Sequence, residues 1–127
     1  MNTSKSKKDV LVIEDEELVQ SFQAQYLQRA GYNVKCADDG QDGLQKLKEC
    51  KPDVIVLDLV MPKMDGFEFL KKVRQNKELK DTPILVFTNL NQPTDIEKAK
   101  NLGADKFLVK VKTTLKVLTQ EIEYAVK

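Results

Sequence analysis

The sequence predicts an α/β domain in which a doubly wound, five-stranded parallel sheet is flanked by five helices. Short apolar runs, such as Val54–Leu57, alternate along the chain with longer segments that have helical spacing. No repeat or low-complexity segment interrupts this alternation. Strands that alternate with helices form parallel sheets covered on both faces, and 127 residues are enough for one such domain.

The first half of the chain contains three predicted strands and two predicted helices. In chain order they are strand Val10–Ile13, helix Glu17–Ala30, strand Asn33–Ala37, helix Gln41–Glu49 and strand Val54–Leu57. The first helix carries apolar residues at steps of four, which form a helical stripe of Leu18, Phe22, Tyr26 and Ala30. Gly31 is a typical stop for that helix.

The second half adds three helices and two strands. In chain order they are helix Gly66–Gln75, strand Ile84–Phe87, helix Pro93–Leu102, strand Lys106–Val109 and helix Thr114–Val126. Pro93 suits the first turn of its helix, and Gly103 suits the position after its end. Thr113 or Thr114 can cap the last helix.

The composition of the strands predicts their order in the sheet. Three runs are apolar on both faces and should be central, whereas the mixed strands around Val34 and Phe107 should lie at the edges. This favours the flavodoxin-like order 2-1-3-4-5. In sheets of that order, ligands bind outside the carboxyl ends of strands 1 and 3, at the topological switch point.

Charge and hydropathy exclude several classes of function. The net charge is +1, so no overall field attracts nucleic acid or an anionic membrane. No apolar stretch approaches the ~20 residues of a membrane span. Residues 1–8 are polar and lysine-rich, which predicts a short disordered tail before a domain of residues 9–127 rather than a signal peptide. The basic cluster of Lys71, Lys72 and Arg74 is interpreted as a solvated face.

The two cysteines, Cys36 and Cys50, match no metal-binding spacing. They are predicted to be free thiols, which is typical of a reducing cytosol. A cytoplasmic location is therefore expected.

Polar residues terminate four of the five predicted strands. They are Glu14, Asp15, Asp58, Thr88 and Lys110. If the strands are parallel, these side chains meet at one edge of the sheet. Asp58 is the most informative of them, because the strand before it should be buried on both faces. A carboxylate in this place can act as a nucleophile toward phosphorus and form an acyl phosphate.

Phosphoryl transfer depends mostly on positioning and on stabilisation of charge. A hard dication, Mg²⁺ or else Mn²⁺, could be held by Asp15 and Asp58, and by Glu14 directly or through a water. The backbone carbonyl of Val60 could complete the protein ligands. Lys110 and the Thr88 hydroxyl could contact phosphoryl oxygens. Taken singly, each residue has a plainer interpretation: acids at a solvated helix start, a strand-end threonine and a surface lysine.

Together these motifs resemble one family. They are Val12–Glu16, Ala37–Gly40, the D-x-x-M-P-x-M-D-G run Asp58–Gly66 with the strand before it, Phe87-Thr88, Gly103–Asp105 and Phe107–Lys110. From residue 9 to about residue 126 the chain is similar to the receiver domain of two-component response regulators, the CheY-like fold.

The resemblance implies a role for each matching residue. Asp58 would accept a phosphoryl group from a phosphohistidine on a sensor histidine kinase or phosphotransfer protein, while Glu14 and Asp15 would hold Mg²⁺. Thr88 and Phe107 would be the switch pair, with the alternative that Phe107 is simply an inward-packed aromatic residue. A downstream protein would bind the face made by the fourth helix, fifth strand and fifth helix. The protein would be a signalling phosphoacceptor, not an enzyme acting on other substrates.

The chain departs from the family at Val111, where most members have a proline after a cis bond. A non-prolyl cis bond costs roughly 2.5–4 kcal/mol, so either the site is strained or the bond is trans and the loop takes another course. In the second case Lys112 is an alternative to Lys110. Val60 and Leu90 are both apolar and cannot orient an attacking water, which predicts an acyl phosphate that lasts minutes to hours.

Two other functions remain as hypotheses. A receiver-like module could bind partners without being phosphorylated. A Mg²⁺-dependent phosphohydrolase with an aspartyl phosphate is the weaker alternative, because such enzymes usually carry a second acid two residues after the nucleophile, where this chain has Val60. The leading interpretation is a stand-alone signalling switch or a receiver from a larger regulator.

Overall fold

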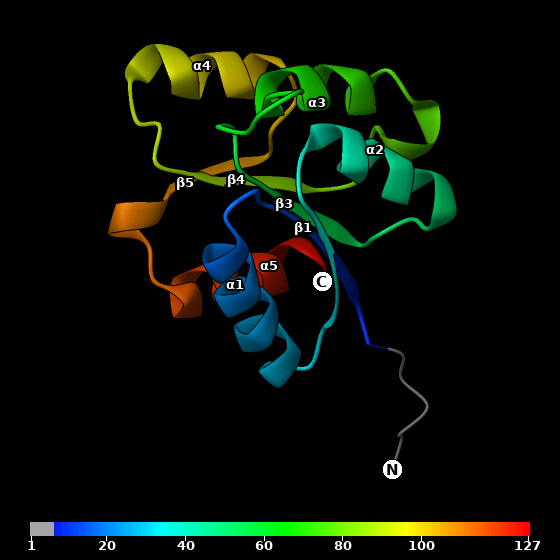
Figure 1. Ribbon diagram of the computed structural model, residues 1–127, viewed down its shortest axis with the longest axis vertical. Helices are drawn as coiled ribbons and strands as arrows, with labels where there is room; N and C mark the ends of the chain where they lie inside the picture. Colours follow the sequence, from blue (N-terminus) through cyan, green and yellow to red (C-terminus); the bar gives the residue numbers. More distant parts are fainter. Residues whose placement is uncertain (1–6) are drawn as a thin grey trace.

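In the computed structural model, which describes residues 7–127, helices cover both faces of one parallel sheet (Figure 1). The strands are β1 (Asp9–Ile13), β2 (Asn33–Ala37), β3 (Val54–Leu57), β4 (Ile84–Thr88) and β5 (Lys106–Val109). The helices are α1 (Glu17–Arg29), α2 (Gly40–Glu49), α3 (Gly66–Arg74), α4 (Pro93–Asn101) and α5 (Leu115–Ala125). Two 3₁₀ turns that the sequence did not predict are η1 (Lys77–Leu79) and η2 (Lys110–Lys112). Most of the predicted tail, residues 1–8, lies outside the described residues.

The strand order is 2-1-3-4-5 and every pairing is parallel, which confirms the predicted fold class. The central position of β1 is visible in its register, since Val12 lies between Cys36 of β2 and Val56 of β3. The two mixed strands, β2 and β5, lie at the edges, where one side of each strand is less covered.

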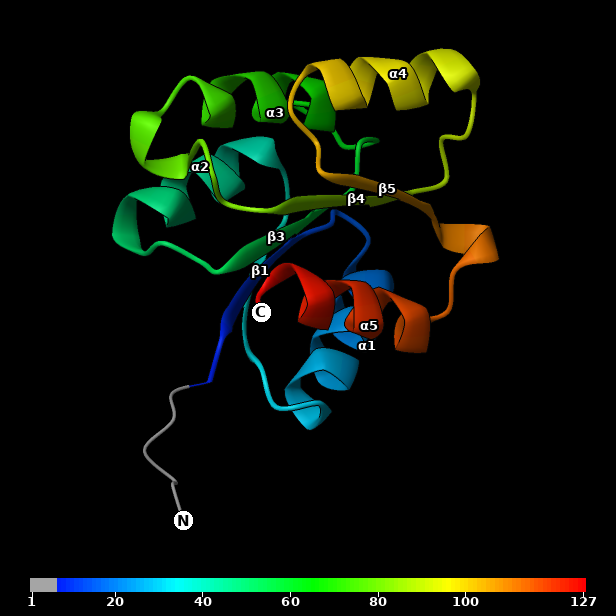
Figure 2. The same cartoon turned by 180° about the vertical axis from the view of Figure 1, so that it is seen from behind.

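Two cores lie on opposite sides of the sheet. Helices α2, α3 and α4 cover one face, and α1 and α5 cover the other (Figures 1 and 2). Because successive side chains of a strand point to opposite faces, Leu11 and Ile13 pack beneath the first group of helices, whereas Val10 and Val12 pack beneath the second. The sheet is therefore buried on both sides, as its apolar runs require.

Helix α1 lies where the sequence predicts it, but its apolar stripe faces the solvent. Leu18 is 71% exposed and Phe22 is 59% exposed, and Tyr26 is exposed as well. The side chains that α1 buries are Gln23 and Leu27. Periodicity identifies a stripe on a helix, but the contacts with β1, β2 and α5 decide which side is covered.

The ends of the helices follow the predicted signals. Gly31 and Gly103 adopt φ values of +102° and +109° after α1 and α4, a region that glycine enters without steric cost. Thr114 caps α5, since its Oγ1 accepts a hydrogen bond from the Val117 N–H at 3.1 Å. Neither α1 nor any other helix within residues 7–127 has the length and apolarity to cross a bilayer.

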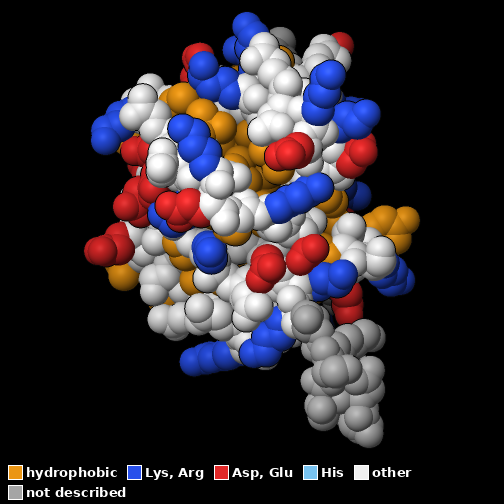
Figure 3. Space-filling model, turned by 90° about the vertical axis from the view of Figure 1, so that its right-hand side faces the viewer, with side chains coloured by type: hydrophobic (Ala, Val, Ile, Leu, Met, Phe, Trp, Pro, Cys, Tyr) orange, Lys and Arg blue, Asp and Glu red, His pale blue; other side chains and the backbone are white. Residues whose placement is uncertain are grey.

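The interpretation of Lys71, Lys72 and Arg74 as one solvated face is wrong for Arg74. Lys71 and Lys72 are exposed, but the Arg74 guanidinium donates to the carbonyls of Leu79 and Gly103 at 2.8 and 2.9 Å and pairs with Asp105. Arg74 thus ties the end of α3 to η1 and to the loop before β5. On the side of the molecule seen in Figure 3, basic and acidic side chains are intermingled.

The two cysteines are not paired with each other. Cys36 and Cys50 are both free and partly buried, which confirms the prediction of free thiols. Burial raises the pKa of the Cys36 thiol, and the nearby charge of Asp38 adds to this effect.

Candidate functional site

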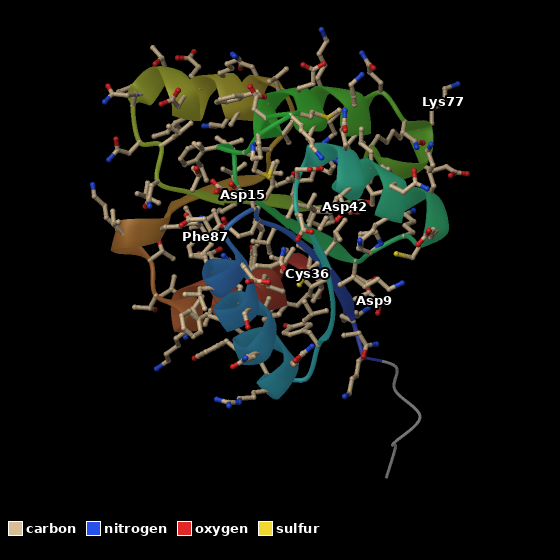
Figure 4. All side chains as sticks on the ribbon, viewed as in Figure 1. Asp9, Asp15, Cys36, Asp42, Lys77 and Phe87 are labelled. Carbon is tan, nitrogen blue, oxygen red and sulfur yellow. The ribbon has the colours of Figure 1, made fainter. Side chains whose placement is uncertain are left out.

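The predicted site residues lie at one edge of the sheet. Glu14 and Asp15 follow β1, Asp58 follows β3, Thr88 ends β4 and Lys110 follows β5. The parallel register brings these strand ends together, since Ile13 is paired with Leu57, and Thr88 with Val109. Figure 4 shows Asp15 at this edge of the sheet, where the chain leaves β1.

Three carboxylates form the acidic part of the site. Glu14, Asp15 and Asp58 each offer one oxygen, and these oxygens lie within 4.8 Å of one another. Glu14 and Asp58 are buried, while Asp15 is open to solvent. A cluster of hard oxygen ligands with one exposed side suits a cation such as Mg²⁺ or Mn²⁺, which keeps several waters in its coordination shell.

Lys110 bridges two of these acids. Its Nζ donates to Glu14 Oε1 and, at 3.2 Å, to Asp58 Oδ2. The Lys110 side chain is 12% exposed, whereas Lys112 is exposed. Lys110 is therefore the lysine whose ammonium reaches the acids.

The protonation of the site follows from burial and charge. Burial raises the pKa of Glu14 and the charge of Asp58 adds to it, while the hydrogen bond from Lys110 opposes the shift. Burial alone would lower the pKa of Lys110, but its hydrogen bond to Glu14 and the charge of Asp58 raise it overall. Lys110 thus stays a cation. The oxygens of the three acids beside it are ligands of the kind that a hard dication binds.

Thr88 and Phe107 lie on the last two strands, Thr88 at the end of β4 and Phe107 within β5. Thr88 is buried, and its Oγ1 accepts a long hydrogen bond, 3.4 Å, from the Leu90 N–H. Phe107 is partly buried and packs against the core on the α2–α3–α4 side. In the register of β4 and β5 it is paired with Val86, two residues before Thr88.

The loop from β3 to α3 holds Asp58 by local contacts. The Val60 N–H donates to Asp58 Oδ1 at 3.3 Å, and the Gly66 N–H donates to the Leu59 carbonyl at 3.0 Å. Asp65 caps α3 by accepting the Glu68 N–H. The carboxylate is therefore oriented by Val60 at one oxygen and by Lys110 at the other.

The loop after β5 is held in a different way. All peptide bonds within residues 7–127 are trans, so the second of the two predicted alternatives holds and the loop turns through η2. The Val111 N–H donates to Asn89 Oδ1 at 3.1 Å. Reasoning from the sequence missed Asn89. The one available signal was Val111 itself, because it has an N–H where proline has none.

A family model described as response regulator receiver domain matches residues 10–123. The chain belongs to this family. One similar protein is the alkaline phosphatase synthesis transcriptional regulatory protein PhoP of Bacillus subtilis. It is 41% identical to this chain, and the match covers 81% of this chain and 42% of that protein. Another is the DNA-binding dual master transcriptional regulator RpaA of Synechocystis, 36% identical over 80% of this chain and 42% of that protein.

Solved receiver structures have the same fold. The chemotaxis protein CheY4 of Vibrio cholerae has a TM-score of 0.89 and 35% identity, covering 94% of this chain and 99% of that one. By contrast, the chain spans about two fifths of the length of the curated regulators it matches. Receiver domains are signalling modules of two-component systems that interact with histidine kinases and downstream effectors. This receiver domain contains an acidic cluster able to hold a metal ion.

Proposed function

We propose that this receiver domain is a Mg²⁺-dependent phosphoacceptor and that Asp58 takes the phosphoryl group. The observation that carries the proposal is the arrangement of charges: three acids converge within 4.8 Å, and the Lys110 ammonium contacts both Glu14 and Asp58. Catalysis of phosphoryl transfer requires a positioned nucleophile surrounded by groups that stabilise the oxygens of the transferred group.

In the proposed reaction Asp58 Oδ attacks the phosphorus of a phosphohistidine on a sensor histidine kinase or phosphotransfer protein. The P–N bond breaks, the imidazole leaves, and an acyl phosphate forms on Asp58. Glu14, Asp15, Asp58 and the Val60 carbonyl would hold Mg²⁺, which supplies charge neutralisation for the incoming group. The Lys110 ammonium then exchanges its contact with Asp58 for one with a phosphoryl oxygen.

The proposed response to phosphorylation begins at Thr88. Within residues 7–127 its hydroxyl makes one long hydrogen bond, as the acceptor of the Leu90 N–H, so its proton is available to donate to a phosphoryl oxygen. In this scheme Thr88 moves toward the phosphoryl group, Phe107 turns further inward, and the α4–β5–α5 face changes the partner that it binds. Such a change is a population shift, for which a few new hydrogen bonds supply enough free energy.

The further expectations belong to the same proposal. The domain works in the cytoplasm, does not bind nucleic acid by itself, and keeps its acyl phosphate for minutes to hours. Val60 and Leu90 support the long lifetime, since neither side chain can hold an attacking water by a hydrogen bond. The names of PhoP and RpaA describe regulators of transcription, and the match covers 42% of each of those proteins.

Phosphorylation by acetyl phosphate with Mg²⁺ tests the proposal. Intact-mass analysis should show a gain of one phosphoryl group that Asp58→Asn abolishes and that chelation of the metal prevents. Asp81→Asn, at an exposed acid between η1 and β4, is the matched control and should leave uptake unchanged. Absence of uptake by the wild type would support a phosphorylation-independent binding module, whereas rapid release of phosphate from many esters would support a phosphohydrolase.

A further inference from the structure

We infer that Asn89 is a positioning residue for phosphotransfer, because its side chain holds the loop that presents Lys110. The inference rests on the proposed function of Asp58. Asn89 Oδ1 accepts the Val111 N–H at 3.1 Å, and this contact, the Asn89–Val111 hydrogen bond, joins the loop after β4 to the loop after β5. Within residues 7–127 no hydrogen bond joins Asn89 or Val111 to an acid of the site, so we infer that Asn89 acts through Lys110.

The Asn89–Val111 hydrogen bond lies directly beside two residues of the proposed site, Thr88 and Lys110. Asn89 directly follows Thr88, and Val111 directly follows Lys110. Thr88 and Val109 are paired in the sheet, so the bond continues the contact between β4 and β5 beyond their last ladder pair. This hydrogen bond therefore joins the loop that follows Thr88 to the loop that contains Lys110.

Apart from the contacts of the Lys110 ammonium with Glu14 and Asp58, the loop that carries Lys110 has few restraints within residues 7–127. The Val111 side chain is 75% exposed and contributes almost no packing. The turn η2 has no side-chain cap at its start, and its end is closed by one long bond from the Thr113 N–H to the Lys110 carbonyl. Lysine loses much rotamer freedom when its ammonium is fixed between two carboxylates. A backbone restrained by Asn89 reduces the further entropy that must be lost to place the ammonium there.

The chemistry of the residue at position 89 is specific. The contact requires an acceptor at the length of an Asn or Asp side chain, which alanine cannot supply. Asp would keep the acceptor but add a charge near an edge that already holds three acids. The donor is equally specific, because a proline at position 111 could not make the bond.

The test compares initial rates of Asp58 phosphorylation by acetyl phosphate at saturating Mg²⁺. Asn89→Ala should slow the reaction by about two- to tenfold, the range expected for loss of one exposed hydrogen bond. The matched control is Asn91→Ala, two residues further along the same exposed loop, which should leave the rate unchanged. Asn89→Asp should retain most of the rate, because it keeps the acceptor.

The decisive measurement repeats Asn89→Ala in a Lys110→Ala background. If Asn89 acts by positioning Lys110, its replacement has no further effect on the residual rate there. An equal loss in both backgrounds, or no loss in the Lys110-containing protein, would overturn the inference. Hydrogen exchange of the Val111 amide, measured by NMR, should accelerate in Asn89→Ala and not in Asn91→Ala.

The outcomes separate this inference from the proposed function. A wild-type protein that takes up no phosphoryl group contradicts both. A wild-type protein that is phosphorylated normally, beside an Asn89→Ala variant with an unchanged rate, contradicts the positioning role of Asn89 alone.

Discussion

The loops after β3 and after β5 lie at the same edge of the sheet, yet they are stabilised in opposite ways. The β3–α3 loop is held by its own residues, through the contacts of Asp58, Asp65 and Gly66 with their near neighbours. The β5–α5 loop is held across a gap of 22 positions in the sequence, by Asn89. The loop of the proposed nucleophile, Asp58, is thus held by local contacts, although Lys110 also contacts the Asp58 carboxylate. The loop of the proposed charge-stabilising lysine is held by a tertiary contact.

The β3–α3 loop is tightly packed at Gly66. A Cβ added at Gly66 would lie 2.6 Å from Leu59 Cα and 2.7 Å from the Asp58 carbonyl oxygen, both of them backbone atoms that cannot give way cheaply. The β5–α5 loop is open, since its residue Val111 points into solvent. Substitutions in the two loops should therefore have different consequences for stability and for phosphotransfer.

The largest effect is expected from removing the Lys110 ammonium from the β5–α5 loop. Lys110→Ala should lower the rate of phosphorylation by about 10²–10³-fold, the cost of losing one charged group that stabilises a transition state. Lys112→Ala is the control, because Lys112 is exposed in the same loop and should leave the rate unchanged. Rates with acetyl phosphate measure both. A loss with Lys112→Ala and not with Lys110→Ala would reverse the assignment.

Gly66→Ala tests how tightly the β3–α3 loop is packed. The clash with Leu59 and Asp58 should destabilise the fold by about 1–3 kcal/mol, the usual cost of overpacking. Val111→Ala in the open loop should change stability by less than about 0.5 kcal/mol. Urea unfolding followed by circular dichroism gives both values. If the two substitutions lower the free energy of unfolding by similar amounts, the two loops do not differ in how tightly they are packed.

The expected lifetime of the proposed acyl phosphate depends on Val60, a side chain of the β3–α3 loop. Val60→Glu introduces a carboxylate that can orient a water by a hydrogen bond, so hydrolysis should become faster by roughly tenfold, less than the ~10²-fold at the lower end of general-base effects. Val60→Leu should leave the lifetime unchanged. Loss of the phosphoryl group from the purified phosphoprotein is followed by intact mass. If the wild type itself loses phosphate within seconds, the explanation from Val60 and Leu90 is wrong.

The smallest effect concerns backbone strain at Lys63 in the β3–α3 loop. Lys63 has φ +64°, in the left-handed region, which costs roughly 1–2 kcal/mol for a residue with a Cβ. Lys63→Gly should relieve this strain and, after the greater entropy of glycine in the unfolded chain is subtracted, stabilise the protein by less than about 1 kcal/mol. Lys63→Ala keeps the strain and loses only the distant ion pair with Asp39, 3.7 Å, so no gain is expected. Thermal unfolding compares the three proteins.

Much of the fold is predictable because its signals are short-range. The apolar runs mark the strands, Gly31 and Gly103 mark helix ends, and the mixed composition of β2 and β5 places them at the edges. The position of Asp58 follows in the same way, since a strand buried on both faces must end where its sequence turns polar. Each of these signals acts over a few residues and has one physical outcome.

The sequence by itself therefore determined the strands, their order and the edge at which the acids meet. Tertiary structure decided what depends on partners distant in the chain. The apolar stripe of α1 faces the solvent, and Gln23 and Leu27 are buried instead. The Arg74 guanidinium donates to the carbonyls of Leu79 and Gly103. The Val111 N–H donates to Asn89. A periodic pattern specifies which residues share a side of a helix, but the packing of the helix decides which side is buried. Likewise a donor group needs an acceptor, but the tertiary structure decides which acceptor lies within reach.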